Sequence, residues 1–526
     1  MFDLLIKNGL IVDGSGSPAF KGDIAVLKGK IESIEPSISD GMAYKVIDAN
    51  GLIIAPGFID IHSHSDILFL QDDRCESKIY QGVTSEVMGQ CGTSVYPCPQ
   101  DKRERIEEYA GEKAMGFASC SLAEFAEKIT KQNKRMGTNL MPLTGHCALR
   151  CGVMGYDDRH ASGPEIKQMA ALLEQDMRDG SWGLSLGLAY VPGISSEVNE
   201  LCDLAAVVTP FNGIVTSHLR SQGVDTPKYL DEMYEIFRRS GAHIHIAHFK
   251  ASGKAAWGLA PEFVKNVRDA QAGGINVTVD VYPYTAASSG ITNSFPKWAV
   301  KGGKEHTMEI IKGPQRQELV DYLEERFPAP DGGEALLIVG TDGLLPEADG
   351  KNLKELGELW GISAAQAAVR VAEETRCNTR AIAFSMCDED VDYMLAQDDF
   401  AIASDGRAHP FAPELNDGKP HPRNFGTFPR FLRLSREKKL CSLETAVRRM
   451  TGLSADIMGI GDRGYIRPGL IADLTLFDYE KVKDNADYKN PFQKPDGIVT
   501  VIINGEIALY NGVQTDVRAG SLILKK

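Results

Sequence analysis

The sequence lacks the features that mark membrane, exported and nucleic-acid-binding proteins. It contains no apolar run of about 18 residues, the length that a membrane-spanning helix needs. The N-terminus has an aspartate at position 3 and no basic-then-apolar export signal. Acidic residues outnumber basic ones by 72 to 57, and the net charge is −15. Nucleic acid and anionic membranes are therefore unfavourable partners, because phosphate binding requires basic patches.

The sequence also lacks a disulfide framework. Its ten cysteines include no Cys-x-x-Cys pair and do not follow the spacing of a small disulfide-rich domain. This usage predicts reduced thiols and a cytoplasmic location. Most of these cysteines should lie in the core, so a functional cysteine needs separate support.

The composition is that of an ordinary globular protein, with 43% apolar and 25% charged residues and no low-complexity tract. A chain of 526 residues is too long for one simple domain, so we expect two or three.

Both chain ends contain short strand-like runs joined by tight turns. Isolated hairpins are marginal in water, so we predict that residues 1–55 and 465–526 pair into one small, β-sandwich-like domain. The runs cover residues 4–13, 23–34, 469–478 and 498–510, with predicted turns at Asn8-Gly9, Gly29 and Asn504-Gly505.

Residues 56–464 alternate between strand-like and helical segments. Such alternation predicts a parallel sheet, and eight units predict a closed (β/α)8 barrel in an α/β fold. A ninth strand-like run, 381–386, is assigned to the periphery. The clearest helical segments are 162–179, 228–239 and 261–272, and the predicted barrel strands end near His64, Cys91, His146, Leu188, Arg220, Lys250, Tyr284 and Asp405.

Residues 285–341 are too many for an ordinary barrel loop. They include a predicted helix at 314–327 and a predicted strand at 335–340, so we expect an insertion that covers the active face. The stretch 405–429 is rich in Gly, Pro, His and Arg and is interpreted as an ordered loop at the mouth of the barrel.

Metal-binding residue types collect at the ends of the predicted strands. Residues i and i+2 of a strand share a face, so His62 and His64 point the same way. Taken alone, such a pair could equally be two hydrogen-bonded histidines in a turn. Six candidates on five strands instead predict a metal site at the carboxyl rim of the barrel, where imidazoles and a thiolate suit Zn²⁺. The six are His62, His64, Cys91, His218, His248 and Asp405.

These motifs resemble the amidohydrolase superfamily and, more narrowly, the D-aminoacylases, which are N-acyl-D-amino acid deacylases. The broad resemblance rests on PGFIDIHSH at 56–64. The narrower one rests on GQCGTS at 89–94, SHLR at 217–220, HFK at 248–250, DVYPY at 280–284, SDG at 404–406 and GTFPR at 426–430.

The resemblance implies one zinc ion held tightly by Cys91, His218 and His248. It implies a second, weaker position at His62 and His64, with Asp405 adjoining. A thiolate is softer than a carboxylated lysine, which agrees with one dominant zinc. The implied reaction is hydrolysis of an N-acyl-D-amino acid. Asp405 would take a proton from the attacking water and pass it to the leaving amine.

Four further residues are candidates for handling this small-molecule substrate. Tyr190 would stabilise the oxyanion, although it could be a core aromatic below the rim. Lys250, with Tyr282 beside it, is expected from the resemblance to bind the substrate carboxylate. Arg380 would add a bidentate clamp, unless it is an ordinary surface arginine.

The resemblance also predicts which side chain of the D-amino acid the site prefers. Relatives that act on acidic D-amino acids carry an arginine in the loop after the DVYPY motif, and the corresponding residues 285–298 contain none. We therefore expect neutral side chains such as those of D-Leu, D-Met or D-Phe. Two alternatives are a hydrolase of cyclic amides, like dihydroorotase or hydantoinase, and a barrel that serves as a non-catalytic scaffold.

Overall fold

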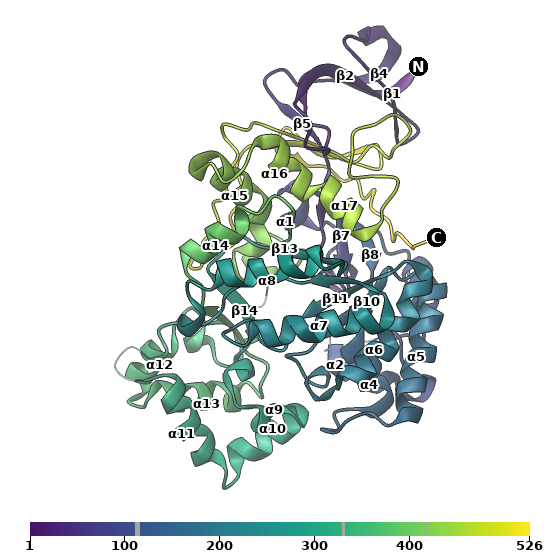
Figure 1. The fold of residues 1–526 in the computed structure, drawn as a ribbon. Helices are drawn as coiled ribbons and strands as arrows, with labels where there is room; N and C mark the ends of the chain where they lie inside the picture. Colours follow the sequence, from purple (N-terminus) through teal and green to yellow (C-terminus); the bar gives the residue numbers. More distant parts are fainter. Residues whose placement is uncertain (111–115, 329–331, 417) are drawn as a thin grey trace.

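A barrel of parallel strands forms the centre of the molecule (Figure 1). The computed structural model describes residues 1–110, 116–328, 332–416 and 418–526. Strands β8 and β9 are separated only by Leu143, so together they fill one of eight strand positions and link two sheets. The predicted (β/α)8 class is confirmed. The strands are β6 (Phe58–Asp60), β7 (Val83–Met88), β8 (Asn139–Pro142), β9 (Thr144–Gly145), β10 (Gly183–Gly187), β11 (Ile214–His218), β12 (His243–Ile246), β13 (Val277–Val281) and β17 (Phe400–Ile402).

The barrel closes just beyond its first and last strands. The backbone N–H of Asp405 donates to the carbonyl of His62 at 2.9 Å, and the N–H of His64 donates to the carbonyl of Gly406 at 2.8 Å. Ser63 and Gly406 also form a parallel bridge. This seam brings candidate ligands from the two ends of the barrel sequence side by side.

The helices around the barrel begin and end at residues with the expected capping chemistry. Ser162 and Glu165 form a capping box at the start of α5, and Gly241, with a φ of 72°, ends α7 in the left-handed conformation. The helices predicted at 162–179, 228–239 and 261–272 are confirmed as α5, α7 and α8. No described helix has the combined length and apolarity needed to cross a membrane. The barrel-associated helices are α1 (Glu76–Ile79), α2 (Arg103–Ala110), α3 (Leu122–Lys131), α4 (His146–Met154), α5 (Gly163–Arg178), α6 (Val198–Val208), α7 (Thr226–Ser240), α8 (Ala260–Ala272), α14 (Asp388–Leu395), α15 (Arg423–Lys438), α16 (Leu443–Met450) and α17 (Gly452–Met458).

The two chain ends build one nine-stranded sheet beside the barrel (Figure 1). It is joined where β5 pairs antiparallel with β18. The predicted turns at Gly29 and at Asn504-Gly505 are confirmed, and both use the positive φ angles that tight hairpin turns require. The strands are β1 (Phe2–Ile11), β2 (Phe20–Leu27), β3 (Lys30–Glu35), β4 (Ala43–Asp48), β5 (Ile53–Pro56), β18 (Leu474–Phe477), β19 (Ile498–Ile503), β20 (Glu506–Tyr510) and β21 (Val513–Gln514).

Two expectations about these ends are wrong in detail. Asn8 does not form a hairpin turn, because β1 continues through it with a shift in register, and the N–H of Asn8 donates to the Asp23 carboxylate instead. Residues 520–525 also leave the nine-stranded sheet. They lie against the barrel, where Leu140 of β8 exchanges backbone hydrogen bonds with residues 521 and 523.

The insertion between β13 and β17 is longer than predicted. Its helix at 314–327 and its strand at 335–340 are confirmed as α11 and β15. The expected end at residue 341 is too early, because the peripheral strand β16 pairs antiparallel with both β14 and β15. The insertion therefore runs from 285 to 386. Its elements are β14 (Ala286–Gly290), α9 (Lys297–Val300), α10 (Gly303–Lys312), α11 (Arg316–Arg326), β15 (Leu336–Gly340), α12 (Leu353–Trp360), α13 (Ala364–Glu374) and β16 (Arg380–Phe384).

A buried ionic cluster lies beneath the seam. The ammonium group of Lys78 donates to the Asp60 carboxylate at 2.6 Å and to the Ser404 hydroxyl at 2.9 Å, and it lies 3.3 Å from the Glu86 carboxylate. The Lys78, Asp60 and Glu86 side chains are fully buried. Asp60 and Ser404 come shortly before His62 and Asp405, so this cluster ties together the two segments that carry candidate ligands.

Replacing Lys78 by methionine is expected to destabilise the fold by about 3–5 kcal/mol, because two buried carboxylates lose their cation. The measurement is the midpoint of urea denaturation. Lys131→Met is the matched control, since Lys131 forms an exposed ion pair with Glu127 and its loss should leave the midpoint unchanged. Equal midpoints for Lys78→Met and the unsubstituted protein would contradict the expectation.

Candidate active site

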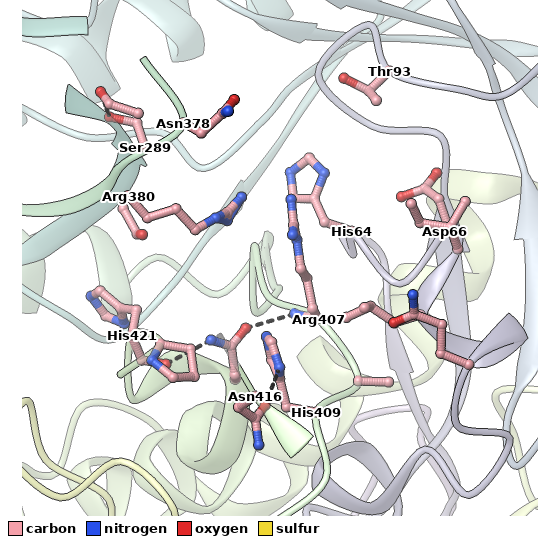
Figure 2. Close-up of a pocket in the computed structure, with 18 of the residues that line it drawn as sticks. His64, Asp66, Thr93, Ser289, Asn378, Arg380, Arg407, His409, Asn416 and His421 are labelled. Atoms are coloured by element: carbon pink, nitrogen blue, oxygen red, sulfur yellow. Dashed lines mark hydrogen bonds between the residues drawn. The ribbon is translucent and has the colours of Figure 1, made fainter. Parts of the chain in front are cut away.

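A cavity of about 1390 Å³ opens where the carboxyl ends of the barrel strands meet the insertion (Figure 2). The barrel contributes His64, Cys91 and Asp405 to its wall, and the insertion contributes Ser289 and Arg380. Ligand sites of barrel enzymes lie at this end of the strands. The insertion thus forms one side of the cavity, as the sequence predicts.

Three of the predicted ligands converge on one point. The Cys91 sulfur lies 3.6 Å from Nδ1 of His218 and 3.5 Å from Nε2 of His248, and these two nitrogens are 2.8 Å apart. They come from the ends of three different strands, β7, β11 and β12.

These separations fit a zinc ion. With Zn–S bonds of about 2.3 Å and Zn–N bonds of about 2.0–2.1 Å, tetrahedral geometry places sulfur and nitrogen about 3.5 Å apart. The two Cys91–histidine distances match this value, whereas the two nitrogens lie somewhat closer together than coordination would hold them. The donor set of one thiolate and two imidazoles also suits zinc chemically.

His62, His64 and Asp405 form a second group of donors beside the first. Asp405 Oδ1 lies 3.2 Å from Nε2 of His64 and 3.7 Å from Nε2 of His62. His62 Nε2 lies 3.4 Å from the Cys91 sulfur. Cys91 therefore adjoins both groups, and it could serve as a ligand for either position or bridge them.

Three of these residues have the left-handed backbone conformation that side chains other than glycine rarely adopt. The φ angles are 53° for Cys91, 37° for His248 and 50° for Asp405. Each costs about 1 kcal/mol or more, and such costs cluster at functional sites. The surrounding hydrogen bonds hold two of them, because Asp405 N–H donates to His62 and His248 N–H donates to the Asp280 carboxylate at 2.7 Å.

Asp405, His64 and His218 carry the charges that metal-dependent chemistry requires. Burial alone would raise the pKa of Asp405, but the Arg423 guanidinium, which donates to Oδ2 at 2.7 Å, helps to hold that pKa well below its usual range. Burial lowers the pKa of His64 to about 4, and burial with the nearby Lys250 lowers that of His218 to about 3. Near neutral pH Asp405 is therefore ionised, and these imidazoles are in the neutral form that binds metals.

His62 and Cys91 differ from these groups. Against the effect of burial, Cys91 and Asp280 raise the pKa of His62 well above its usual value, and burial raises the pKa of the Cys91 thiol. These two groups must therefore lose a proton when a metal binds.

Buried polar side chains orient the ligands from behind. The Asp280 carboxylate contacts Nε2 of His245 at 2.9 Å and lies 3.5 Å from Nδ1 of His62. Gln222 approaches Nδ1 of His248 at 3.1 Å. Such contacts to the far ring nitrogen set the tautomer and orientation of a metal-binding histidine.

The predicted substrate-binding residues occupy two different places. Tyr190 and Arg380 line the large cavity, with the Tyr190 ring centroid 4.6 Å from that of His218. Burial raises the pKa of Tyr190 well above its ordinary value, so its phenol stays protonated and can donate. Lys250 and Tyr282 instead lie behind His248, around a small hollow. There Lys250 Nζ is 2.8 Å from His248 Nδ1, and the Tyr282 hydroxyl is buried without a hydrogen-bond partner among the described residues.

Sequence reasoning missed Arg407 and Arg423. The richness of residues 405–429 in arginine and histidine was the available signal, and it pointed to the mouth of the barrel. No spacing pattern distinguishes the arginine that reaches Asp405 from its neighbours, because that contact depends on where α15 begins relative to the seam.

Comparison with known proteins agrees with the motif resemblance. Residues 45–509 match the model of the Amidohydrolase family. The chain is 32% identical over 505 residues to an N-acyl-D-glutamate deacylase of Alcaligenes xylosoxydans xylosoxydans, which covers 96% of this chain and 93% of the relative. It is 30% identical over 532 residues to a D-aminoacylase of the same organism, and this match covers 100% of this chain and 98% of the relative.

Solved structures give the same result. The N-acyl-D-glutamate deacylase of Bordetella bronchiseptica, in complex with zinc and a phosphonate inhibitor, superposes with a TM-score of 0.83 at 29% identity and covers 99% of both chains. The L-hydantoinase of Arthrobacter aurescens, with a TM-score of 0.59 at 16% identity, shares the fold. The chain belongs to the amidohydrolase family.

Proposed function

We propose that this protein is a metal-dependent N-acyl-D-amino acid deacylase that releases a carboxylate and a free D-amino acid. The observation that carries the proposal is the convergence of six candidate ligands, three of which, His64, Cys91 and Asp405, line one cavity. The other three are His62, His218 and His248. Two of the relatives named above are an N-acyl-D-glutamate deacylase and a D-aminoacylase, and this chain matches each of them over nearly its whole length. The full set of candidate ligands argues against a non-catalytic scaffold.

One zinc ion, held by Cys91, His218 and His248, is the proposed tight site, and His62 and His64 form the weaker position. A zinc ion there would polarise the substrate carbonyl and lower the pKa of a coordinated water to about 7. The thiolate of Cys91 supports one dominant ion, because its softness favours zinc at the position that also has two imidazoles.

Asp405 is the proposed general base. Its ionised carboxylate takes a proton from the attacking water as the oxygen bonds to the acyl carbon. It then gives that proton to the nitrogen as the carbon–nitrogen bond breaks, so protons balance over the cycle. Tyr190, as a neutral phenol on the cavity wall, donates a hydrogen bond to the developing oxyanion.

Arg380 is the proposed anchor for the α-carboxylate of the substrate. Its guanidinium reaches the cavity from the insertion, and a bidentate contact would fix the carboxylate relative to the scissile amide. Fixing the carboxylate, the amide and the side chain at three points separates D from L substrates. The carboxylate role of Lys250 and Tyr282 stays a prediction. In the structure Lys250 contacts His248 and would have to leave it to reach a substrate.

Hydrolysis of N-acetyl-D- and N-acetyl-L-amino acid pairs tests the proposed reaction. We expect free amino acid from the D member of each pair only, in an assay of amine release with zinc-loaded protein. Turnover of hydantoin or dihydrouracil, together with no turnover of any N-acyl-D-amino acid, would instead favour a cyclic-amide hydrolase.

Asp405→Asn should lower kcat by at least about 10²–10⁴-fold, because the amide cannot accept the proton. Zinc bound by the protein, measured by atomic absorption after dialysis, should stay near the unsubstituted level. An unchanged thermal midpoint would show that Arg423 tolerates the loss of its partner. Substantial activity in this variant would remove Asp405 from the role of base.

Cys91→Ala should lose the tightly bound zinc, because a donor of the proposed tight site is gone. His62→Asn is the matched variant from the weaker position, and it should reduce activity far more than zinc content. Both are measured by metal analysis alongside amine release. If His62→Asn loses as much zinc as Cys91→Ala, the proposed division into tight and weak positions is incorrect.

A further inference from the structure

The cavity wall contains two arginines whose guanidinium groups form no ion pair within the part of the chain that the structure describes. Arg380 comes from the insertion and Arg407 from the loop after β17, and both side chains point into the cavity (Figure 2). Among the described residues, no carboxylate forms an ion pair with either guanidinium, and neither group makes a hydrogen bond. The other two arginines of the wall are paired, Arg423 with Asp405 and Arg74 with Asp72.

Among the described residues, no acid of the cavity wall forms an ion pair with either arginine. Asp66 accepts a hydrogen bond from the N–H of Gly89, and Asp72 is bonded to Arg74. Asp342 favours the charge of Arg380, but at a separation longer than an ion pair, and Arg423 opposes it. For Arg407, the charge of Arg380 is the strongest opposing one, whereas Asp66 and then Asp405 favour its charge without forming an ion pair with it in the described chain. Arg380 is exposed and Arg407 half-buried, so water solvates both in the open cavity, and a substrate that displaces this water leaves two like charges for an anion to compensate.

A substrate with a single carboxylate would leave one of these two arginines without an anionic partner. An N-acyl-D-amino acid with a neutral side chain and a simple acyl group has one carboxylate. One carboxylate matches one guanidinium in a bidentate pair. If Arg380 holds the α-carboxylate, Arg407 still faces the cavity with its donors unused. The cavity volume of about 1390 Å³ leaves room for a longer substrate, since drug-sized ligands occupy pockets of about 300–1,000 Å³.

We infer that the preferred substrates are N-acyl-D-amino acids with a second carboxylate, and that Arg407 binds it. The inference rests on the proposed deacylase function. The second carboxylate lies either on the amino acid side chain or at the far end of the acyl group, and the chemistry at Arg407 is the same for both. The inference departs from the expectation of neutral side chains, which rests on the absence of arginine from residues 285–298 and stays a prediction. The cationic group comes from residue 407 instead.

Arg407 is suited to a test by substitution. Its backbone N–H donates to the Asn424 side chain, and its carbonyl accepts from the Ser77 hydroxyl, whereas its guanidinium makes no hydrogen bond within the described chain. A change of side chain therefore leaves these backbone contacts in place. Arg135, which is exposed and outside the cavity wall, offers a matched control for the loss of one positive charge.

The experiment compares kcat/KM for two substrate pairs that differ in one charge. N-acetyl-D-glutamate and N-acetyl-D-glutamine test the side-chain position, and N-succinyl-D-methionine and N-butanoyl-D-methionine test the acyl position. The zinc-loaded unsubstituted protein should prefer the dicarboxylate in at least one pair by about 10-fold or more. Arg407→Gln should reduce that preference by about 10- to 100-fold, Arg407→Lys should retain part of it, and Arg135→Gln should leave it unchanged.

Each contrary result has a distinct meaning. Equal rates within both pairs for the unsubstituted protein overturn the inference without any variant, so a misfolded Arg407→Gln does not block the test. An equal loss on all four substrates in Arg407→Gln overturns it too, because that pattern belongs to a residue acting on the reaction centre. If none of the four is hydrolysed, the proposed deacylase function itself fails.

Discussion

The seam between the first and last barrel strands is the constraint on which the site depends. Two backbone hydrogen bonds join residues 62–64 to residues 405–406, more than 340 positions apart in the chain. Beneath them, the buried ammonium of Lys78 binds Asp60 and Ser404, one from each side of the seam. Without this closure the histidine pair and Asp405 would belong to separate edges of an open sheet.

The electrostatic balance of the site follows from that closure. Asp405 is buried, and a buried carboxylate tends to take up a proton. Arg423, at the start of α15, reverses this tendency and leaves an ionised group beside the imidazoles. Burial keeps His64 and His218 neutral at the same time. One environment thus holds an ionised carboxylate beside two neutral imidazoles, the charge states that general-base catalysis and metal binding use.

The insertion supplies one side of the cavity at the mouth of the barrel. Residues 285–386 form a separate three-stranded sheet with its own helices, and this sheet carries Arg380 to the cavity. Arg407 reaches the same cavity from the barrel. These two guanidinium groups of the wall therefore come from separate parts of the chain, which only the folded structure brings together.

The sequence by itself determined the barrel, the β-rich ends and the six candidate ligands, because these depend on local periodicity and on strand ends meeting at one rim. The turns at Gly29 and Asn504-Gly505 could be predicted because they depend on local backbone preference. The turn predicted at Asn8-Gly9 is absent from the described structure, because the N–H of Asn8 donates to Asp23 on the next strand and β1 continues. Tertiary structure alone decided that the insertion ends at 386, that Lys250 contacts His248, and that Arg380 and Arg407 face one cavity. Each of these rests on contacts between distant segments, whose geometry no spacing along the chain encodes.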